Sequence, residues 1–545
     1  MKKKYVRWTL WTVASPFILF IILCILIYLP PIQNFLVDKA AVYASEATGM
    51  KITVGRISLS FPLNLVVTDV DAASQHNDTL LSVHRLQVNV QLLPLLKKQV
   101  EVDGISLQGA TVNSNDLISG MTLTGTLGEL FISSHGVALD PETAVVNKVL
   151  LKDTDLSLCL NDTTAADTTK SDTTYWKIIL QDIDLQNVAF ALDMPQDSLS
   201  LKTALDKASL RNGLIDLHKS AYSLQTFQIK NARVRYDSGA PVPDAPADSL
   251  PKGFDPSHIS LTGIGVKLDS LHYEGRDMKA IISQFVLKEQ SGLEIVSTEG
   301  RLISNNKVLR VPSLRLATPD SYLELNASMD WSALDAKSDG LISARLMADI
   351  AKPDVVRFMG GMDEKFIQQY PSEPMRIRTG IDGDLNKLKL TTLSAELPGA
   401  LELFAKGELT HLTDSLLRGG DITLEAETKD LKFVSALAEG IEIPYGTRLE
   451  GKFTMAGQKM GTDMLLMQPE ARALAEADTI PITVHNDSIS VADDFKMERA
   501  ARLFAKYDMS VDRYEADVAV NHFDLHQFMP ADSLYTLSTR LKVEG

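Results

Sequence analysis

Apolar and polar residues alternate with a period of two along most of the chain after residue 50. In one segment Leu86, Val88 and Val90 are separated by glutamine and asparagine. A period of two predicts β-strands with one apolar and one wetted face, and turn signals such as Asn305-Asn306 separate the strands. The same alternation recurs over residues 323–329, 422–426 and 514–520. The chain is therefore predicted to be mainly β, elongated and repetitive, with few short helices.

A weak internal repeat accompanies the alternation. Its form is apolar-x-apolar-x-[Gly/Asp/Asn]-x-x-apolar, and ordinary alternation would produce part of it by chance. The third defined position suits a left-handed backbone, so we expect a bulge there, after which the alternation resumes on a re-aimed face. The irregular spacing of the copies is typical of an array rather than one barrel. The bulge positions of the five copies are Gly109, Asp153, Asn187, Asn231 and Gly263.

Few segments depart from the strand pattern. Residues 352–370 have a helical pattern that Gly360-Gly361 divides in two, and residues 431–439 are expected to form one or two turns. Residues 238–257 contain five prolines and are predicted to form a loop.

A sheet of this length cannot close as one small barrel, yet its apolar face has to be covered. Either the sheet curls on itself around a dry core, or it remains an open furrow that is filled from outside. Both arrangements demand the same alternation, so the sequence leaves both open. The candidate functional residues are the inward-facing apolar ones: Leu86, Val88, Val90, Leu107, Val112, Leu185, Phe190, Ile229, Val234, Leu323, Leu325 and Leu424.

The N-terminus carries a predicted membrane anchor. Residues 9–29 are uncharged and long enough to cross about 30 Å of hydrocarbon as a helix. Residues 1–8 contain three lysines and an arginine, which indicates a cytoplasmic tail and places the rest of the chain outside the cytoplasm. The competing interpretation, a cleaved signal peptide, would have a shorter apolar core. Residues 30–48 are predicted to form a juxtamembrane helix, or else a simple connector.

Composition narrows the function classes. The net charge of -16, from 70 acidic and 54 basic residues, disfavours nucleic acid as a partner because like charges repel. Of the 2 cysteines, Cys24 lies in the apolar N-terminal run, so no disulfide with Cys159 is expected.

No pattern of catalytic chemistry stands out. His522 and His526 are four residues apart, but no glutamate follows His522 as in a zinc-protease helix. Aspartate pairs such as Asp153 and Asp155 lack the glycine-containing series of a calcium loop. The phosphate-loop and nucleophile-elbow patterns are also missing. We therefore predict no catalytic residue, no metal site and no cofactor, and hence not an enzyme.

Several segments of the sequence resemble a known family. The anchor, the entry strand over residues 51–60 and the Ile-x-Leu-x-Asn-Ala-x-Val strands resemble the AsmA-like superfamily. Residues 314–325 and 521–530 resemble its TamB branch, the inner-membrane component of the translocation and assembly module, of Bacteroidetes type. This resemblance is to an N-terminal portion, since TamB proteins are much longer and the chain stops at Gly545, which we interpret as mid-sheet.

The resemblance implies a U-shaped β-groove, in a first part over residues 49–237 and a second over 258–545. It implies a single-pass inner-membrane protein with a periplasmic body that carries phospholipid towards the outer membrane. The alternative that it implies is an outer-membrane biogenesis and protein secretion factor, acting by β-strand contacts. The resemblance also implies an outer-membrane partner of the TamA or BamA type, which TamB proteins meet through a C-terminal domain beyond the portion that this chain resembles. A third hypothesis is an anchored structural solenoid with a dry core.

Overall fold

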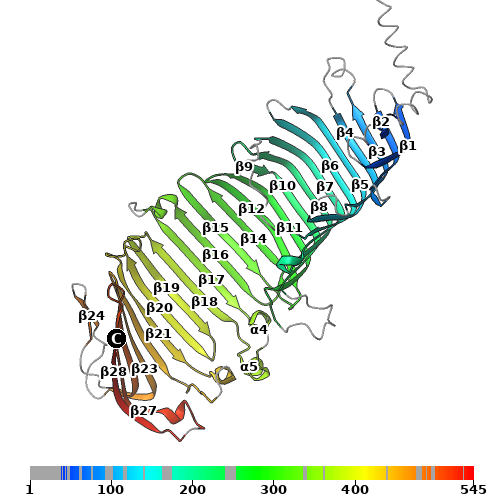
Figure 1. Ribbon diagram of the computed structural model, residues 1–545. Helices are drawn as coiled ribbons and strands as arrows, with labels where there is room; N and C mark the ends of the chain where they lie inside the picture. The colour runs from blue at the N-terminus through cyan, green and yellow to red at the C-terminus, as the bar shows by residue number, and fades with distance from the viewer. Residues whose placement is uncertain are drawn as a thin grey trace, which may run out of the picture. The chain divides into compact units, whose positions relative to one another are not determined.

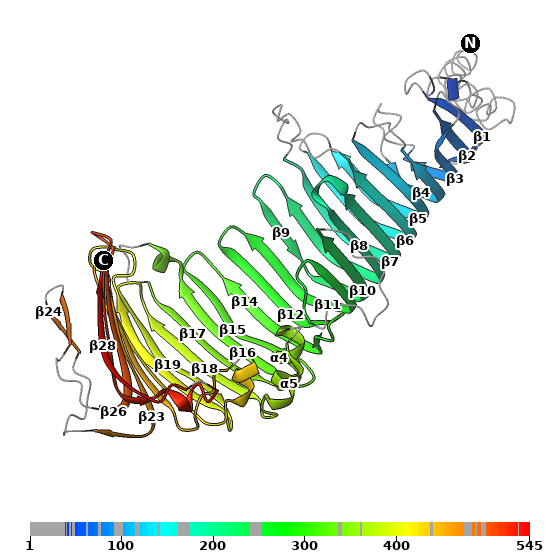
Figure 2. The same cartoon turned by 60° about the horizontal axis from the view of Figure 1, so that its bottom comes forward.

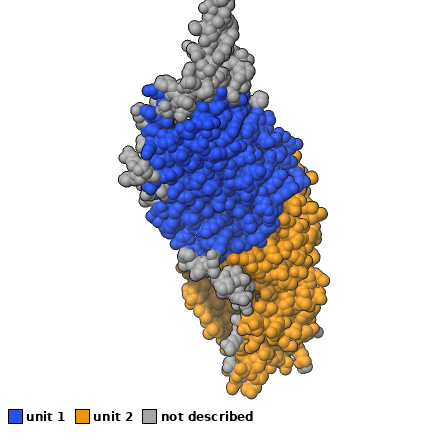
Figure 3. Space-filling view, turned by 90° about the vertical axis from the view of Figure 1, so that its right-hand side faces the viewer, with its two compact units in different colours: residues 1–245, 256–275 blue, residues 246–255, 276–545 orange. Residues whose placement is uncertain are grey.

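The computed structural model of the chain is mainly β, and Figure 1 shows its strands side by side. It describes residues 39, 41–42, 45, 50–60, 64–74, 78–91, 102–114, 120–138, 142–161, 175–239, 253–335, 340–359, 362–436, 440–473, 482–485, 488–491, 497–531 and 533–545. The chain divides into two compact units, coloured in Figure 3. Unit 1 comprises residues 1–245 and 256–275, and unit 2 comprises residues 246–255 and 276–545.

Unit 1 is a sheet in which each strand pairs antiparallel with the next, except that β6 and β7 pair in parallel. The strands β9 and β10 both lie between β8 and β11. A one-turn helix, Pro195–Asp197, links β7 to β8. The strands are β1 (Lys51–Ser60), β2 (Asn64–Ala73), β3 (Thr79–Val90), β4 (Val102–Asn113), β5 (Met121–Ala138), β6 (Thr143–Leu160), β7 (Lys177–Met194), β8 (Leu199–Asp216), β9 (Ala221–Leu224), β10 (Thr226–Ser238) and β11 (His258–Glu274).

Unit 2 is an antiparallel sheet in which sequential strands are neighbours. Its strands turn progressively, so that β26 to β28 stand steeply relative to the earlier ones (Figure 2). The strands are β12 (Asp277–Glu289), β13 (Glu294–Ile295), β14 (Ser297–Ser304), β15 (Val308–Ala317), β16 (Tyr322–Asp330), β17 (Ile342–Ile350), β18 (Met375–Gly383), β19 (Lys387–Leu397), β20 (Leu401–Thr410), β21 (Gly419–Thr428), β22 (Arg448–Ala456), β23 (Lys459–Ala473), β26 (Met497–Asp508), β27 (Arg513–Asp524) and β28 (Thr536–Glu544). β24 (Ile482–His485) and β25 (Ser488–Val491) form a separate hairpin.

The two α-helices whose bounds the structure gives both belong to unit 2. They are α4 (Lys352–Met359) and α5 (Glu364–Gln369), so the predicted division of this segment in two is confirmed. The predicted turns over residues 431–439 correspond to a short 3-10 helix, η4 (Lys432–Ala436). Two further 3-10 helices, Trp331–Leu334 and Leu525–Gln527, follow β16 and β27.

A transverse row of residues interrupts the hydrogen-bond ladder of unit 1. Pairing is regular on both sides of this row, which we call the kink row. Its members on β2, β4, β6, β7 and β10 have φ between +50° and +62°, the left-handed region that interrupts a strand. The row consists of Gly55, Asp69, His84, Gly109, Gly128, Asp153, Asn187, Asp206 and Asn231.

The predicted bulge residues account for much of the kink row. Four of them belong to it, and the fifth, Gly263 on β11, has φ of 61° beside a register shift against β10. The left-handed conformation predicted at all five is confirmed. Where the residue is not glycine, side-chain hydrogen bonds support it: Asn187 Nδ2 donates to Asp153 Oδ1 at 2.9 Å, and Asn231 donates to Asp206. The left-handed conformation costs a non-glycine residue about 1–2 kcal/mol.

The predicted anchor, residues 9–29, lies outside the described residues. Within the described part of the chain, no helix combines the length and the apolar character that a membrane crossing requires. Of the predicted juxtamembrane segment, 30–48, the positions that the structure describes are helical, namely Lys39, Ala41, Val42 and Ser45. Most of the predicted loop over 238–257 also lies outside the described residues.

Candidate functional site

Cross-strand pairing in unit 1 brings apolar residues into continuous rows. On one side of the kink row the apolar positions of β4 are Ile105 and Leu107, and on the other side they are Ala110 and Val112. The alternation therefore shifts by one residue at Gly109, as a left-handed residue within a strand produces. The row through Leu107 joins Ile57, Val67, Leu86, Leu107, Leu130, Leu151, Leu185, Ala208, Ile229 and Val266.

Two further apolar rows run parallel to it. The row through Val88 joins Leu59, Leu65, Val88, Ile105, Ile132, Val149, Ile183, Leu210, Phe227 and Leu268. Beyond the kink row, a third joins Ile52, Ala72, Leu81, Val112, Gly125, Leu156, Phe190, Thr203, Val234 and Leu261. Unit 1 thus presents one apolar face, hereafter the apolar face of unit 1, along its whole series of strands.

Unit 2 repeats this arrangement, and its rows define the apolar face of unit 2. One row contains both Leu325 and Leu424 and joins Leu314, Leu325, Leu346, Thr379, Leu393, Ala405, Leu424, Gly451, Met464, Leu503, Val518 and Leu541. The next joins Leu316, Leu323, Ala348, Ile377, Ala395, Leu403, Ala426, Leu449, Leu466, Ala501 and Val520.

Most large side chains of these rows are not sealed in a dry core, although the row members Ala72, Ala208, Ala348 and Ala405 are buried. Every sequence-predicted candidate with a described side chain is half-buried, apart from Phe190, which is 37% exposed. Val90 pairs with Val102 at the end of β3, and its side chain lies outside the described residues. A half-buried side chain retains apolar surface that a ligand could remove from water.

The opposite face of each sheet carries the charges. In unit 2, ion pairs join adjacent strands on this charged face, such as Lys387 to Glu408 at 3.0 Å and Arg376 to Glu396 at 3.5 Å. On β27 a hydrogen bond from Arg540 holds the pKa of Asp517 below its usual value. Apolar residues thus alternate with charged ones, as the period of two predicts.

At the C-terminal strands the charged face is the more buried one. Asp463 and Arg502 pair there, with Nε to Oδ1 at 2.7 Å, and their side chains are 1% and 8% exposed. Leu465 and Phe504 are buried on the same face. The period of two predicts that the polar residues of a strand face water. Here that prediction is wrong, because Asp463 and Arg502 lie on a buried face together with Leu465 and Phe504.

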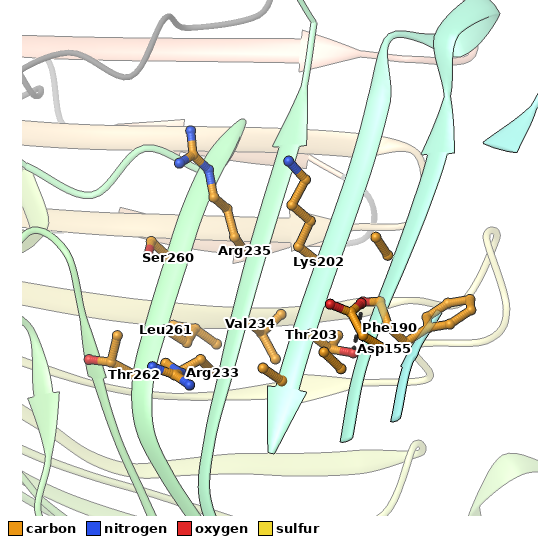
Figure 4. Close-up of a pocket in the computed structure, with 13 residues that line it drawn as sticks. Asp155, Phe190, Lys202, Thr203, Arg233, Val234, Arg235, Ser260, Leu261 and Thr262 are labelled. Atoms are coloured by element: carbon orange, nitrogen blue, oxygen red, sulfur yellow. Dashed lines mark hydrogen bonds between the residues drawn. The ribbon is translucent and has the colours of Figure 1, made fainter. Parts of the chain in front are cut away.

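A hollow of about 330 Å³ lies in unit 1, on strands β6, β7, β8, β10 and β11 (Figure 4). Its lining includes the neighbours Phe190, Thr203 and Val234 of the third apolar row, and the Thr203 hydroxyl donates to the Phe190 carbonyl at 3.2 Å. In Figure 4 the side chains of Lys202 and Arg235 extend away from this apolar group. The lining combines these apolar side chains with charged ones, among them Asp155 and Arg233.

A cluster at one end of the strands covers part of the apolar face of unit 2. Phe366 of α5 packs against Tyr370 and Phe433, with ring centroids 5.6 Å away in each case. Leu397 and Leu431 complete the contact, and burial raises the pKa of the Tyr370 phenol. We call Phe366, Tyr370, Leu397, Ala400, Leu431 and Phe433 the rim cluster.

Sequence reasoning found individual members of the rows but not the rows themselves. Row neighbours such as Leu130, Leu151 and Leu346 alternate as the chosen residues do, so the same signal could have found them. The rim cluster gave no such signal, because it joins a helix and two turns that are far apart in sequence. Asp153, once weighed as a calcium ligand, accepts a hydrogen bond from Asn187 in the kink row.

The chain matches no family model, no curated protein and no solved structure in the comparisons made with each.

Proposed function

We propose that this protein is an inner-membrane-anchored periplasmic bridge that carries phospholipid along its apolar faces towards the outer membrane. The observation that carries the proposal is the continuity of the apolar rows, most of whose large side chains are half-buried or exposed rather than sealed. Acyl chains lying along such a face would gain about 0.8 kcal/mol for each CH₂ group removed from water. In this proposal, the predicted anchor over residues 9–29 attaches the protein to the inner membrane. The family resemblance indicates that the rest of the chain lies in the periplasm.

The first test is the isolation of the full chain from native membranes, followed by mass spectrometry of extracted lipids. We expect phospholipid to co-isolate in more than the trace found with a membrane-anchored protein of unrelated fold. Isolation free of phospholipid would contradict the proposal.

A paired substitution tests where the lipid lies. Leu325→Lys introduces a charge into the apolar face of unit 2, whereas Asn326→Lys, the control, introduces the same charge at the next residue on the opposite face. We expect L325K to reduce lipid transfer between donor and acceptor vesicles at least tenfold and N326K to leave it unchanged. Equal effects of the two variants would exclude this face as the path.

A further inference from the structure

A cation without an acidic partner stands at the turn between β20 and β21. Arg418 Nε donates to the Gly457 carbonyl at 3.0 Å, and the guanidinium contacts Met509 Sδ at 3.4 Å. Both partners are neutral, and among the described residues no carboxylate forms an ion pair with Arg418. The side chain is half-buried. A guanidinium in this state keeps donors available for an anion with a planar pair of oxygens.

Arg418 lies in line with the apolar face of unit 2. It precedes Gly420 and Ile422 by two and four residues, and alternation places all three on the same side of the sheet. Met509 follows Tyr507 by two residues, so alternation places these two side chains on one side of the sheet as well. Tyr507 pairs with Met460 of β23. Gly420 pairs with Leu409 on one side and with Met455 on the other, so apolar side chains flank the part of the face that leads to the guanidinium.

The other end of the same strands is closed. The rim cluster includes Leu397, which shares the face of Ala395 and pairs with Leu401 at the end of β19. Phe366, Tyr370 and Phe433 pack against this end. The apolar face of unit 2 therefore has one end sealed by hydrocarbon and aromatic rings and one end that is open beside a cation.

We infer that unit 2 takes a phospholipid crosswise, with the phosphate on Arg418 and the acyl chains pointing along β19 to β22 towards the rim cluster. This inference rests on the proposed function and adds the orientation of the lipid. Residues 418–428 of β21 and its turn span about 33 Å. The acyl chains of one leaflet span about 15 Å, half of a bilayer core, so headgroup and chains fit within the strand.

Two photoactivatable phosphatidylglycerols test the orientation on the full chain in detergent. One carries a diazirine at the end of an acyl chain, and the other carries it on the headgroup. We expect the headgroup probe to label peptides containing residues 411–418 or 509–512, and the acyl probe to label peptides containing residues 397–403 or 431–436. The reverse pattern, or headgroup labelling around Lys352 at the closed end, would overturn the orientation.

Substitution of Arg418 tests the phosphate contact. Loss of a charge-assisted hydrogen bond should lower headgroup labelling about tenfold in Arg418→Ala, while Arg418→Lys keeps part of it. The matched control is Arg448→Ala, since Arg448 is exposed and lies 3.5 Å from Glu427 on the charged face. Unchanged amide exchange in β20 to β22 would show that R418A is folded. Undiminished headgroup labelling in folded R418A would refute the contact.

Three outcomes distinguish the sources of phosphate and separate this inference from the proposed function. Displacement of the headgroup probe by inorganic phosphate at millimolar concentration would identify a general phosphate site and overturn the lipid assignment. Labelling by neither probe, together with isolation free of phospholipid, would remove the proposed function itself. Lipid that co-isolates but labels both ends of the strands equally would overturn the orientation alone.

Discussion

At the scale of single residues, the left-handed φ angles of the kink row limit which side chains these positions accept without a loss of stability. Asn187 has φ of 50° and donates to Asp153. A β-branched side chain is a poor fit to that conformation, so we expect Asn187→Val to lower the free energy of unfolding by about 1–3 kcal/mol. Asn187→Gly accepts the angle and loses only the hydrogen bond, so it should cost less. Urea unfolding of both variants measures the difference, and equal costs would mean that the angle does not matter.

The buried ion pair gives a second prediction at this scale. Asp463→Ala leaves Arg502 buried without its partner, which should cost about 3–5 kcal/mol of stability. The double replacement Asp463→Leu with Arg502→Met removes both charges and should restore most of the loss. Thermal unfolding of the single and double variants tests this coupling. A double variant as unstable as the single one would show that the pair itself stabilises the fold.

At the scale of elements, the exposed strand β28 is held partly by charge. A hydrogen bond from Arg540 lowers the pKa of Asp517, and Lys542 lies 3.5 Å from the same carboxylate. A lowered folded pKa means that the interaction stabilises the fold above the unfolded pKa of about 3.9 and is lost as the pH falls through the folded value. We therefore expect the amides of β28 to exchange faster in Asp517→Asn than in wild type at pH 7. As the pH falls from about 4 through the lowered folded pKa, the two proteins should converge.

The control for this prediction is Asp421→Asn. Asp421 lies 3.8 Å from Lys452 and is about half exposed, so its pair contributes little. Exchange in β28 should not respond to it. A difference between D517N and wild type that persists in acid would show that the effect is not the titration of Asp517.

At the scale of the whole molecule, the sequence predicted the strands and the bulges but not their register. Leu325 and Leu424 were chosen because each alternates with polar neighbours, yet their membership of one row depends on every pairing between β16 and β21. A shift of one residue in any pairing would have moved them to opposite faces. The rim cluster could not be predicted either, because Phe366 and Phe433 meet only through the tertiary fold.

A linear array also predicts how damage spreads. Most contacts join neighbouring strands, so stability is close to a sum of local terms. We expect Asn187→Val to raise amide exchange in β6 to β8 and to leave β19 to β22 unaffected. Hydrogen exchange followed by mass spectrometry of peptides measures this directly. Equal acceleration along the whole chain would show one cooperative unit instead.

The parallel pairing of β6 with β7 bears on how such a chain can change its length. Where three successive strands pair antiparallel, removing the middle one would bring together two strands that run in the same direction. Insertions and deletions in those parts of the sheet therefore have to involve two strands at a time. Excising β7 would instead leave β6 and β8 antiparallel, with Leu160 and Leu199 at the same end. Asn187 separates Asp153 from Asp206, and its removal would set two carboxylates side by side. A shortened chain that skips β7 would therefore require a neutral residue at one of those two positions.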